Sequence, residues 1–157
     1  AGSGKDVRWP TGQGAKGSDG VTAQVRSTEG AIGYAEVSYA RSGSLGVVKV
    51  GNAAGRFVDP TASAVTAALT TANVAPDGTV ALDFSTTNPD AYPISTVTYV
   101  VLSKAPRDAG RGALMRSFVD YALGDGQSVA ERLAYAPLPE RIAAPARRML
   151  AAIGSGS

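Results

Sequence analysis

The order of strand-forming and helix-forming segments is the feature that most limits how this chain can fold. The run YPISTVTYVVLSK at residues 92–104 is rich in β-branched and aromatic residues and predicts a long strand. Every later segment has a helical pattern, so the helices after residue 104 have only earlier strands to cover. Strands mixed with helices indicate an α/β fold. The strand at 92–104 is longer than one small sheet needs.

Shorter strands are expected at residues 7–10, at the start of 31–40, at 45–51 and at 79–84. Helices are expected at residues 21–27, 59–72, 108–123, 127–135 and 141–153. Ser18 or Asp19 is predicted to cap the first helix, and Pro145 is predicted to break or kink the last one. The helix at 108–123 carries an apolar face that is predicted to pack on something outside this sequence. That face consists of Leu114, Met115, Phe118, Val119, Ala122 and Leu123.

Composition excludes several classes of function. The 157 residues include no Cys and no His, which rules out thiol nucleophiles, disulfides, Cys/His zinc sites and a Ser-His-Asp triad. The net charge is only +2, and the tightest basic pair, Arg147 and Arg148, is interpreted as part of a solvated helix face. We therefore expect no catalytic residue, no metal site, no cofactor and no nucleic-acid partner. No apolar run is long enough to cross a membrane.

Two glycine-rich segments could bind phosphate groups. GSGKD at residues 2–6 looks like the end of a P-loop, but Asp6 stands where Ser or Thr is needed, and no strand can come before the segment. The loop TGQGAKGSDG at 11–20 offers Gly14, Lys16 and Gly17 as candidates for an anion-binding nest at a helix start. The alternative, which we favour, is that these glycines only permit positive φ in a tight connection.

Isolated side chains carry little signal. Trp9 could stack on a ligand, but a buried anchor is the better interpretation. Tyr34, Glu36 and Tyr39 alternate as strand residues would, and Glu36 is expected to face solvent.

Four blocks together carry a resemblance to a known family. They are WPTGQGAKGSDGV (9–21), GAIGYAEVSYA (30–40), DAYPISTVTYVVL (90–102) and YAPLPE (135–140). In this order and spacing, the chain resembles the C-terminal half of the phosphate-binding protein of the high-affinity phosphate ABC transporter. The likeness runs from about residue 7 to residue 153.

The resemblance implies part of a two-lobed periplasmic-binding-protein fold of type II, incomplete in this chain. Residues 1–91 would then lie mainly in the second lobe, 92–104 would cross between lobes, and 105–157 would return to the first lobe as C-terminal helices. The family binds phosphate through an S-G-T-[ST] motif, an arginine and an aspartate. No segment here matches that motif, so the resemblance places the ligand contacts before Ala1.

The function that the resemblance implies is capture of inorganic phosphate for import through ABC permease subunits, without catalysis. The protein would be periplasmic or extracellular, and a lipid anchor at a missing N-terminus is one option. Three alternatives stay open: a binding protein for another oxyanion, an extracellular scaffold and, with least support, a phosphohydrolase.

Overall fold

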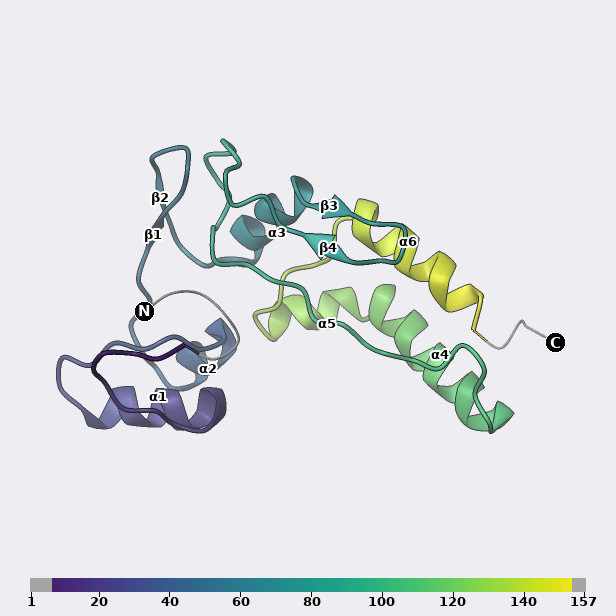
Figure 1. Cartoon of the computed structure of the whole chain (residues 1–157), viewed down its shortest axis with the longest axis horizontal. Coiled ribbons are helices and arrows are strands. Elements are labelled where there is room, and N and C mark those ends of the chain that lie inside the picture. Colours follow the sequence, from purple (N-terminus) through teal and green to yellow (C-terminus); the bar gives the residue numbers. More distant parts are fainter. Residues whose placement is uncertain (1–6, 154–157) are drawn as a thin grey trace. The chain divides into compact units, whose positions relative to one another are not determined.

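The structure is a computed structural model that describes residues 7–153 (Figure 1). The chain divides into two compact units, Ala1–Val47 and Val48–Ser157, which we call the N-terminal unit and the C-terminal unit. The P-loop-like segment at residues 2–6 lies outside the described residues.

The N-terminal unit contains helices α1 (Gly17–Ser27) and α2 (Val37–Ser42). The predicted caps of α1 are wrong, because the helix starts at Gly17 with Lys16 as its N-cap, and Ser18 and Asp19 lie inside it. Gly17 has a φ of +66°, and the carbonyl of Lys16 already accepts a hydrogen bond from the Gly20 N–H at 3.2 Å. The chain therefore turns into the helix before it reaches either expected cap.

The strands expected at 7–10 and at the start of 31–40 are absent from the described residues. Glu36 is instead the N-cap of α2, and its carbonyl accepts a hydrogen bond from the Tyr39 N–H at 3.0 Å. Tyr34, Glu36 and Tyr39 thus do not alternate along a strand, and that prediction is wrong. A strand needs a neighbour to accept its hydrogen bonds, and the described part of this unit provides none.

The C-terminal unit contains two antiparallel strand pairs, each with two residues per strand. β1 (Val50–Gly51) pairs with β2 (Phe57–Val58), and β3 (Asn73–Val74) pairs with β4 (Val80–Ala81). In the first pair Val50 lies opposite Val58. The strands expected at 45–51 and 79–84 exist only as these short segments.

The long strand predicted at 92–104 is wrong as secondary structure. No strand is assigned there, and Figure 1 shows the segment as a plain trace between β4 and α4. Its side chains are largely uncovered, and Val101 is 93% exposed. The sequence favours an extended backbone, but no neighbouring strand pairs with the segment within residues 7–153.

The remaining helices confirm the helical predictions. They are α3 (Ala62–Thr70), α4 (Ala109–Leu123), α5 (Gln127–Arg132) and α6 (Glu140–Ala151). The Thr61 side chain caps α3 by accepting a hydrogen bond from the Ala64 N–H at 3.1 Å. The Asp108 carboxylate caps α4 by accepting one from the Arg111 N–H at 2.9 Å. Gly124 follows the last residue of α4, where the sequence predicted its end.

Pro145 does not break the last helix, since α6 continues from Glu140 to Ala151 with Pro145 inside it. A proline within a helix removes one hydrogen bond and costs about 3 kcal/mol. Ile142 and Ala143 before the proline and Leu150 after it are all buried. Burial on both sides of Pro145 therefore holds the helix together.

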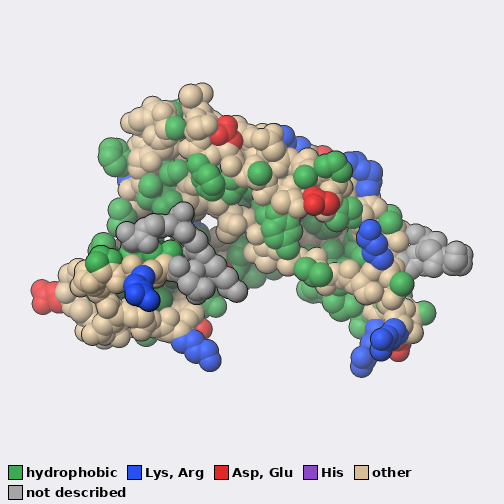
Figure 2. All heavy atoms as spheres, in the orientation of Figure 1, with side chains coloured by type: hydrophobic (Ala, Val, Ile, Leu, Met, Phe, Trp, Pro, Cys, Tyr) green, Lys and Arg blue, Asp and Glu red, His purple; other side chains and the backbone are tan. Residues whose placement is uncertain are grey.

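The core lies in the C-terminal unit and is small. Its buried residues are Ala64, Ala68, Leu69, Ala72, Ala91, Ile142, Ala143 and Leu150. By contrast, α4 contains no buried residue, and Leu114 and Phe118 are 71% and 61% exposed. Figure 2 shows hydrophobic side chains at the surface over the region of α4 and α5. The expectation that the apolar face of α4 lacks its usual cover is confirmed.

Replacing leucine by alanine should lower stability much more in the core than on α4. Leu69 is 2% exposed, so Leu69→Ala should lower the free energy of unfolding by about 2–4 kcal/mol. Leu114→Ala, the matched control, should change it by less than about 0.5 kcal/mol. Urea denaturation followed by circular dichroism measures both. A loss on Leu114→Ala equal to that on Leu69→Ala would show that α4 is covered within this chain.

Candidate functional site

The predicted anion nest is an exposed start of a helix. Gly14, Lys16 and Gly17 all lie at the surface of the N-terminal unit. The first N–H groups of α1 and the Lys16 ammonium favour an anion there, but Asp19 places a negative charge in the same first turn. A Cβ added at Gly14 or Gly17 would meet nothing within 4 Å, so only the positive φ of Gly17 demands glycine. The nest therefore stays a prediction.

Two of the resembling blocks meet within the N-terminal unit. The rings of Trp9 and Tyr34 lie 6.4 Å apart, centre to centre, at an angle of 42°. Gly33 lies so close to α1 that a Cβ there would be 2.9 Å from a methyl group of Val25. Trp9 is nonetheless 60% exposed, so the prediction of a buried anchor is wrong. Tyr34 is also exposed.

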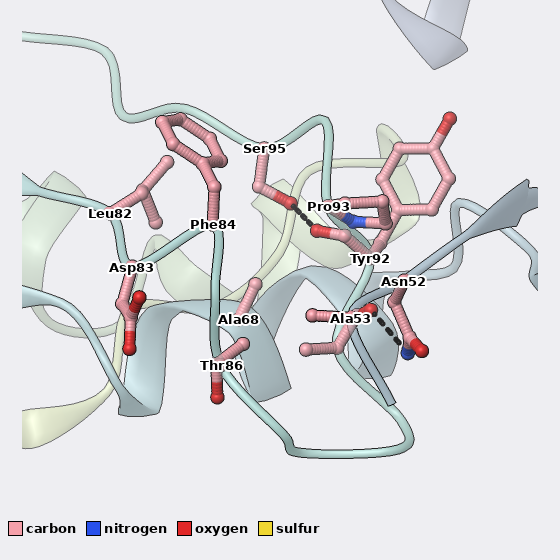
Figure 3. Close-up of a pocket in the computed structure, with 11 residues that line it drawn as sticks. Asn52, Ala53, Ala68, Leu82, Asp83, Phe84, Thr86, Tyr92, Pro93 and Ser95 are labelled. Atoms are coloured by element: carbon pink, nitrogen blue, oxygen red, sulfur yellow. Dashed lines mark hydrogen bonds between the residues drawn. The ribbon is translucent and has the colours of Figure 1, made fainter. Parts of the chain in front are cut away.

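In the C-terminal unit, Asn52 joins the β1–β2 hairpin to the start of the third block. Its amide nitrogen lies 3.0 Å from the carbonyl oxygen of Pro89, 3.1 Å from that of Ala91 and 3.4 Å from that of Asn88. Its side-chain oxygen accepts hydrogen bonds from the N–H groups of Ala54 and Arg56. Figure 3 shows Asn52 beside the segment that carries Tyr92. One side chain thus fixes two chain segments.

The same segment is tied to α3. The Tyr92 N–H donates to the Ala64 carbonyl at 3.0 Å, and the Ser95 hydroxyl donates to the Tyr92 carbonyl at 2.8 Å (Figure 3). Burial raises the pKa of the Tyr92 phenol. The segment is therefore held on both sides before it enters the unpaired stretch at 94–102.

Asn52, Tyr92 and Ser95 are among the residues that line a cavity with a volume of about 10 Å³, which is no more than a single water molecule needs. At its rim, the hydroxyl and the N–H of Ser85 donate to Asp83 at 2.6 and 3.0 Å and lower the pKa of that carboxyl group. Such a cavity has no room for a phosphate ion. We conclude that Asn52, Tyr92 and Ser95, which we call the Asn52 cluster, hold chain segments together and do not bind a ligand.

Sequence reasoning missed Asn52. The available signal was its position in NAAG, since Asn followed closely by Gly marks a turn and Gly55 does adopt a φ of +76°. Nothing in the sequence indicated that the amide would also reach residues 88–91. Within residues 7–153, no group of three acidic side chains is placed to hold a metal ion.

Comparison with known proteins identifies the family. A family model described as a PBP superfamily domain matches residues 3–125, which is most of the chain. The chain belongs to the PBP superfamily. Its helices and few strands fit part of the α/β fold of a periplasmic binding protein.

Individual relatives of this PBP superfamily chain share the name phosphate-binding protein PstS. The chain is 35% identical to that of Pasteurella multocida over 144 residues and 34% identical to that of Xylella fastidiosa over 146 residues. Each match covers 90% of this chain, and 41% and 39% of the respective relative. A mycobacterial relative, phosphate-binding protein PstS 3 of Mycobacterium leprae, is 34% identical over 150 residues. The chain thus spans about two fifths of the length of these relatives.

None of the helices in the described part of the chain combines the length and the apolar character that crossing a bilayer requires.

Removing the Asn52 amide tests the structural role of the cluster. Asn52→Ala leaves the partly buried carbonyl groups of Asn88 and Ala91 without their donor, so the free energy of unfolding should fall by about 1–2 kcal/mol. Asn73→Ala is the matched control, because Asn73 is exposed and should change stability by less than about 0.5 kcal/mol. Urea denaturation measures both variants. Equal stability of the two would contradict the assigned role of Asn52.

Proposed function

We propose that this chain is part of an extracytoplasmic solute-binding protein that captures inorganic phosphate for import by an ABC transporter. The observation that supports this most strongly is the similarity to proteins named phosphate-binding protein PstS over nine tenths of the chain. The work of such a protein is binding and lobe closure rather than catalysis. Its place is the periplasm or the outer face of the membrane, and its partner is an ABC permease.

The phosphate contacts, in this proposal, come from polypeptide that the relatives have and this chain lacks. A buried oxyanion needs many fixed donors, because an unpaired buried charge costs several kcal/mol or more. The cavity beside Asn52 holds at most one water molecule, and the loop at Gly14, Lys16 and Gly17 is open to solvent. Neither arrangement replaces the hydration shell of a phosphate ion.

The uncovered apolar surfaces of the C-terminal unit support the same proposal. Residues 94–102 and the α4 face with Leu114 and Phe118 would pack against the remaining polypeptide of the complete protein. In the two-lobed arrangement, residues 1–91 belong mainly to the second lobe, 92–104 cross between lobes, and 105–157 return to the first. An unpaired, β-prone segment at 92–104 fits a crossing strand whose partners lie outside this chain.

The proposal predicts that the 157-residue chain does not bind phosphate specifically by itself. Exposed Lys and Arg side chains would attract the ion only weakly, and salt would screen that attraction. Isothermal titration calorimetry with phosphate, and with sulfate as the competing oxyanion, measures this at moderate ionic strength. A saturable one-to-one isotherm near micromolar affinity would contradict the prediction.

A relative provides the matched control. The full-length phosphate-binding protein PstS of Pasteurella multocida should bind phosphate, and its segment that aligns with this chain should not. If the lone chain did bind, Lys16→Ala would show whether the glycine-rich loop is the site. A loss of affinity of about a hundredfold, or 2.7 kcal/mol, would place the ion there. Tighter binding of sulfate than phosphate by the complete protein would assign it to another oxyanion.

A further inference from the structure

The C-terminal unit has an open groove that the proposed function does not use. It lies between the turn of the β3–β4 hairpin and one side of α6, and its volume is about 610 Å³. Val74 and Pro76 line it from the hairpin, and Arg141, Pro145, Arg148 and Met149 line it from α6. The hairpin and the helix touch at one end, where a Cβ on Gly78 would lie 2.8 Å from the Met149 sulfur.

The spacing of the α6 residues puts the two arginines on one side of the helix. Arg141 and Arg148 are seven residues apart, which is two helical turns and roughly 10 Å along the axis. Pro145 and Met149 lie between and beside them on the same side. Pro145 and Met149 thus contribute apolar side chains to the groove, and Arg141 and Arg148 contribute positively charged ones.

Charge gathers on this helix. α6 carries Glu140, Arg141, Arg147 and Arg148, so three positive charges less one negative give +2, which equals the net charge of the whole chain. Arg147 is already engaged, since it pairs with Glu140 at 2.7 Å and donates to the Leu123 carbonyl at 3.0 Å. Neither Arg141 nor Arg148 forms an ion pair within residues 7–153.

The two groove arginines differ in how they are held. The Arg141 guanidinium donates to the Thr70 carbonyl, which fixes its position at the groove without neutralising its charge. Arg148 is exposed. The nearest acidic residue of the hairpin turn, Asp77, accepts a hydrogen bond from the Thr79 N–H of its own turn at 2.9 Å. The groove therefore presents two positive charges with no carboxylate paired to them among the described residues.

We propose that this groove docks an acidic amphipathic helix of a partner protein. Two carboxylates seven residues apart on that helix would match the roughly 10 Å spacing of Arg141 and Arg148. A leucine or similar side chain between the carboxylates would lie on Pro145 and Met149. The groove is lined on two sides, by the hairpin and by α6, which suits the side chains of a helix better than the flat surface of a bilayer. This inference is independent of phosphate capture.

The probe is a fluorescein-labelled helical peptide of about 15 residues, a length at which helices begin to persist in water. It carries Glu at two positions seven apart and Leu midway between them, and its control carries Gln in place of both Glu residues. Fluorescence anisotropy with the 157-residue chain should show saturable binding of the Glu peptide and at least tenfold weaker binding of the Gln peptide. Added salt should weaken the first interaction.

Protein variants show whether the groove is responsible. Arg148→Glu should weaken the Glu peptide about tenfold or more. Arg132→Glu makes the same change in net charge on exposed α5 and should alter binding less than twofold. Circular dichroism confirms that both variants keep their helices.

Three results would overturn the proposal: no binding of the Glu peptide, equal weakening by both variants, and displacement of the peptide by equimolar inorganic phosphate. Displacement by phosphate would assign the groove to a free oxyanion. If the peptide does not bind and the chain binds phosphatidylglycerol vesicles through Arg148, the groove is assigned to a membrane surface.

Discussion

A β-strand persists only where a neighbouring strand accepts its backbone hydrogen bonds, and the strand-prone segments of this chain have almost no such neighbours. The described ladders, β1–β2 and β3–β4, extend over two residues per strand. The most β-prone segment, 94–102, has no ladder within residues 7–153, and Val101 is 93% exposed. Helices satisfy their own hydrogen bonds, so α3, α4 and α6 form where the sequence places them.

The same shortage of neighbours limits the core. Five of the eight buried hydrophobic residues in the described part of the chain are alanines, whereas larger apolar side chains such as Leu114 and Phe118 stay at the surface. In place of a sheet, single side chains tie segments together. Asn52 bonds the chain at 88–91 to the first hairpin, and Arg147 bonds the end of α4 to α6. A chain that spans about two fifths of its relatives and exposes this much apolar surface is consistent with a fold completed by further polypeptide.

Local rules predicted the helices well because helices depend on near neighbours. The ranges 59–72 and 108–123 expected from the sequence contain α3 and α4, and Gly124 follows α4 directly. Prediction was wrong where distant contacts decide. Glu36 starts a helix because no strand lies beside it within residues 7–153, and Pro145 is tolerated because α6 is buried on both sides of it. The start of α1 is a local error, since the positive φ of Gly17 turns the chain before Ser18. The four resembling segments indicated the family from sequence alone. The hydrogen bonds of Asn52 to residues 88–91 could not be predicted, because no nearby residue in the sequence indicates them.

The central claim is that residues 94–102 pair with no strand in the described part of the chain. Hydrogen exchange of backbone amides, followed by mass spectrometry, tests it most directly. We expect amides of 94–102 to exchange within about tenfold of the rate of an unstructured peptide, while those of α3 around Leu69 are slowed by about a thousandfold or more. Protection of 94–102 equal to that of α3 would contradict the account, because it would mean that the segment is already paired within these 157 residues.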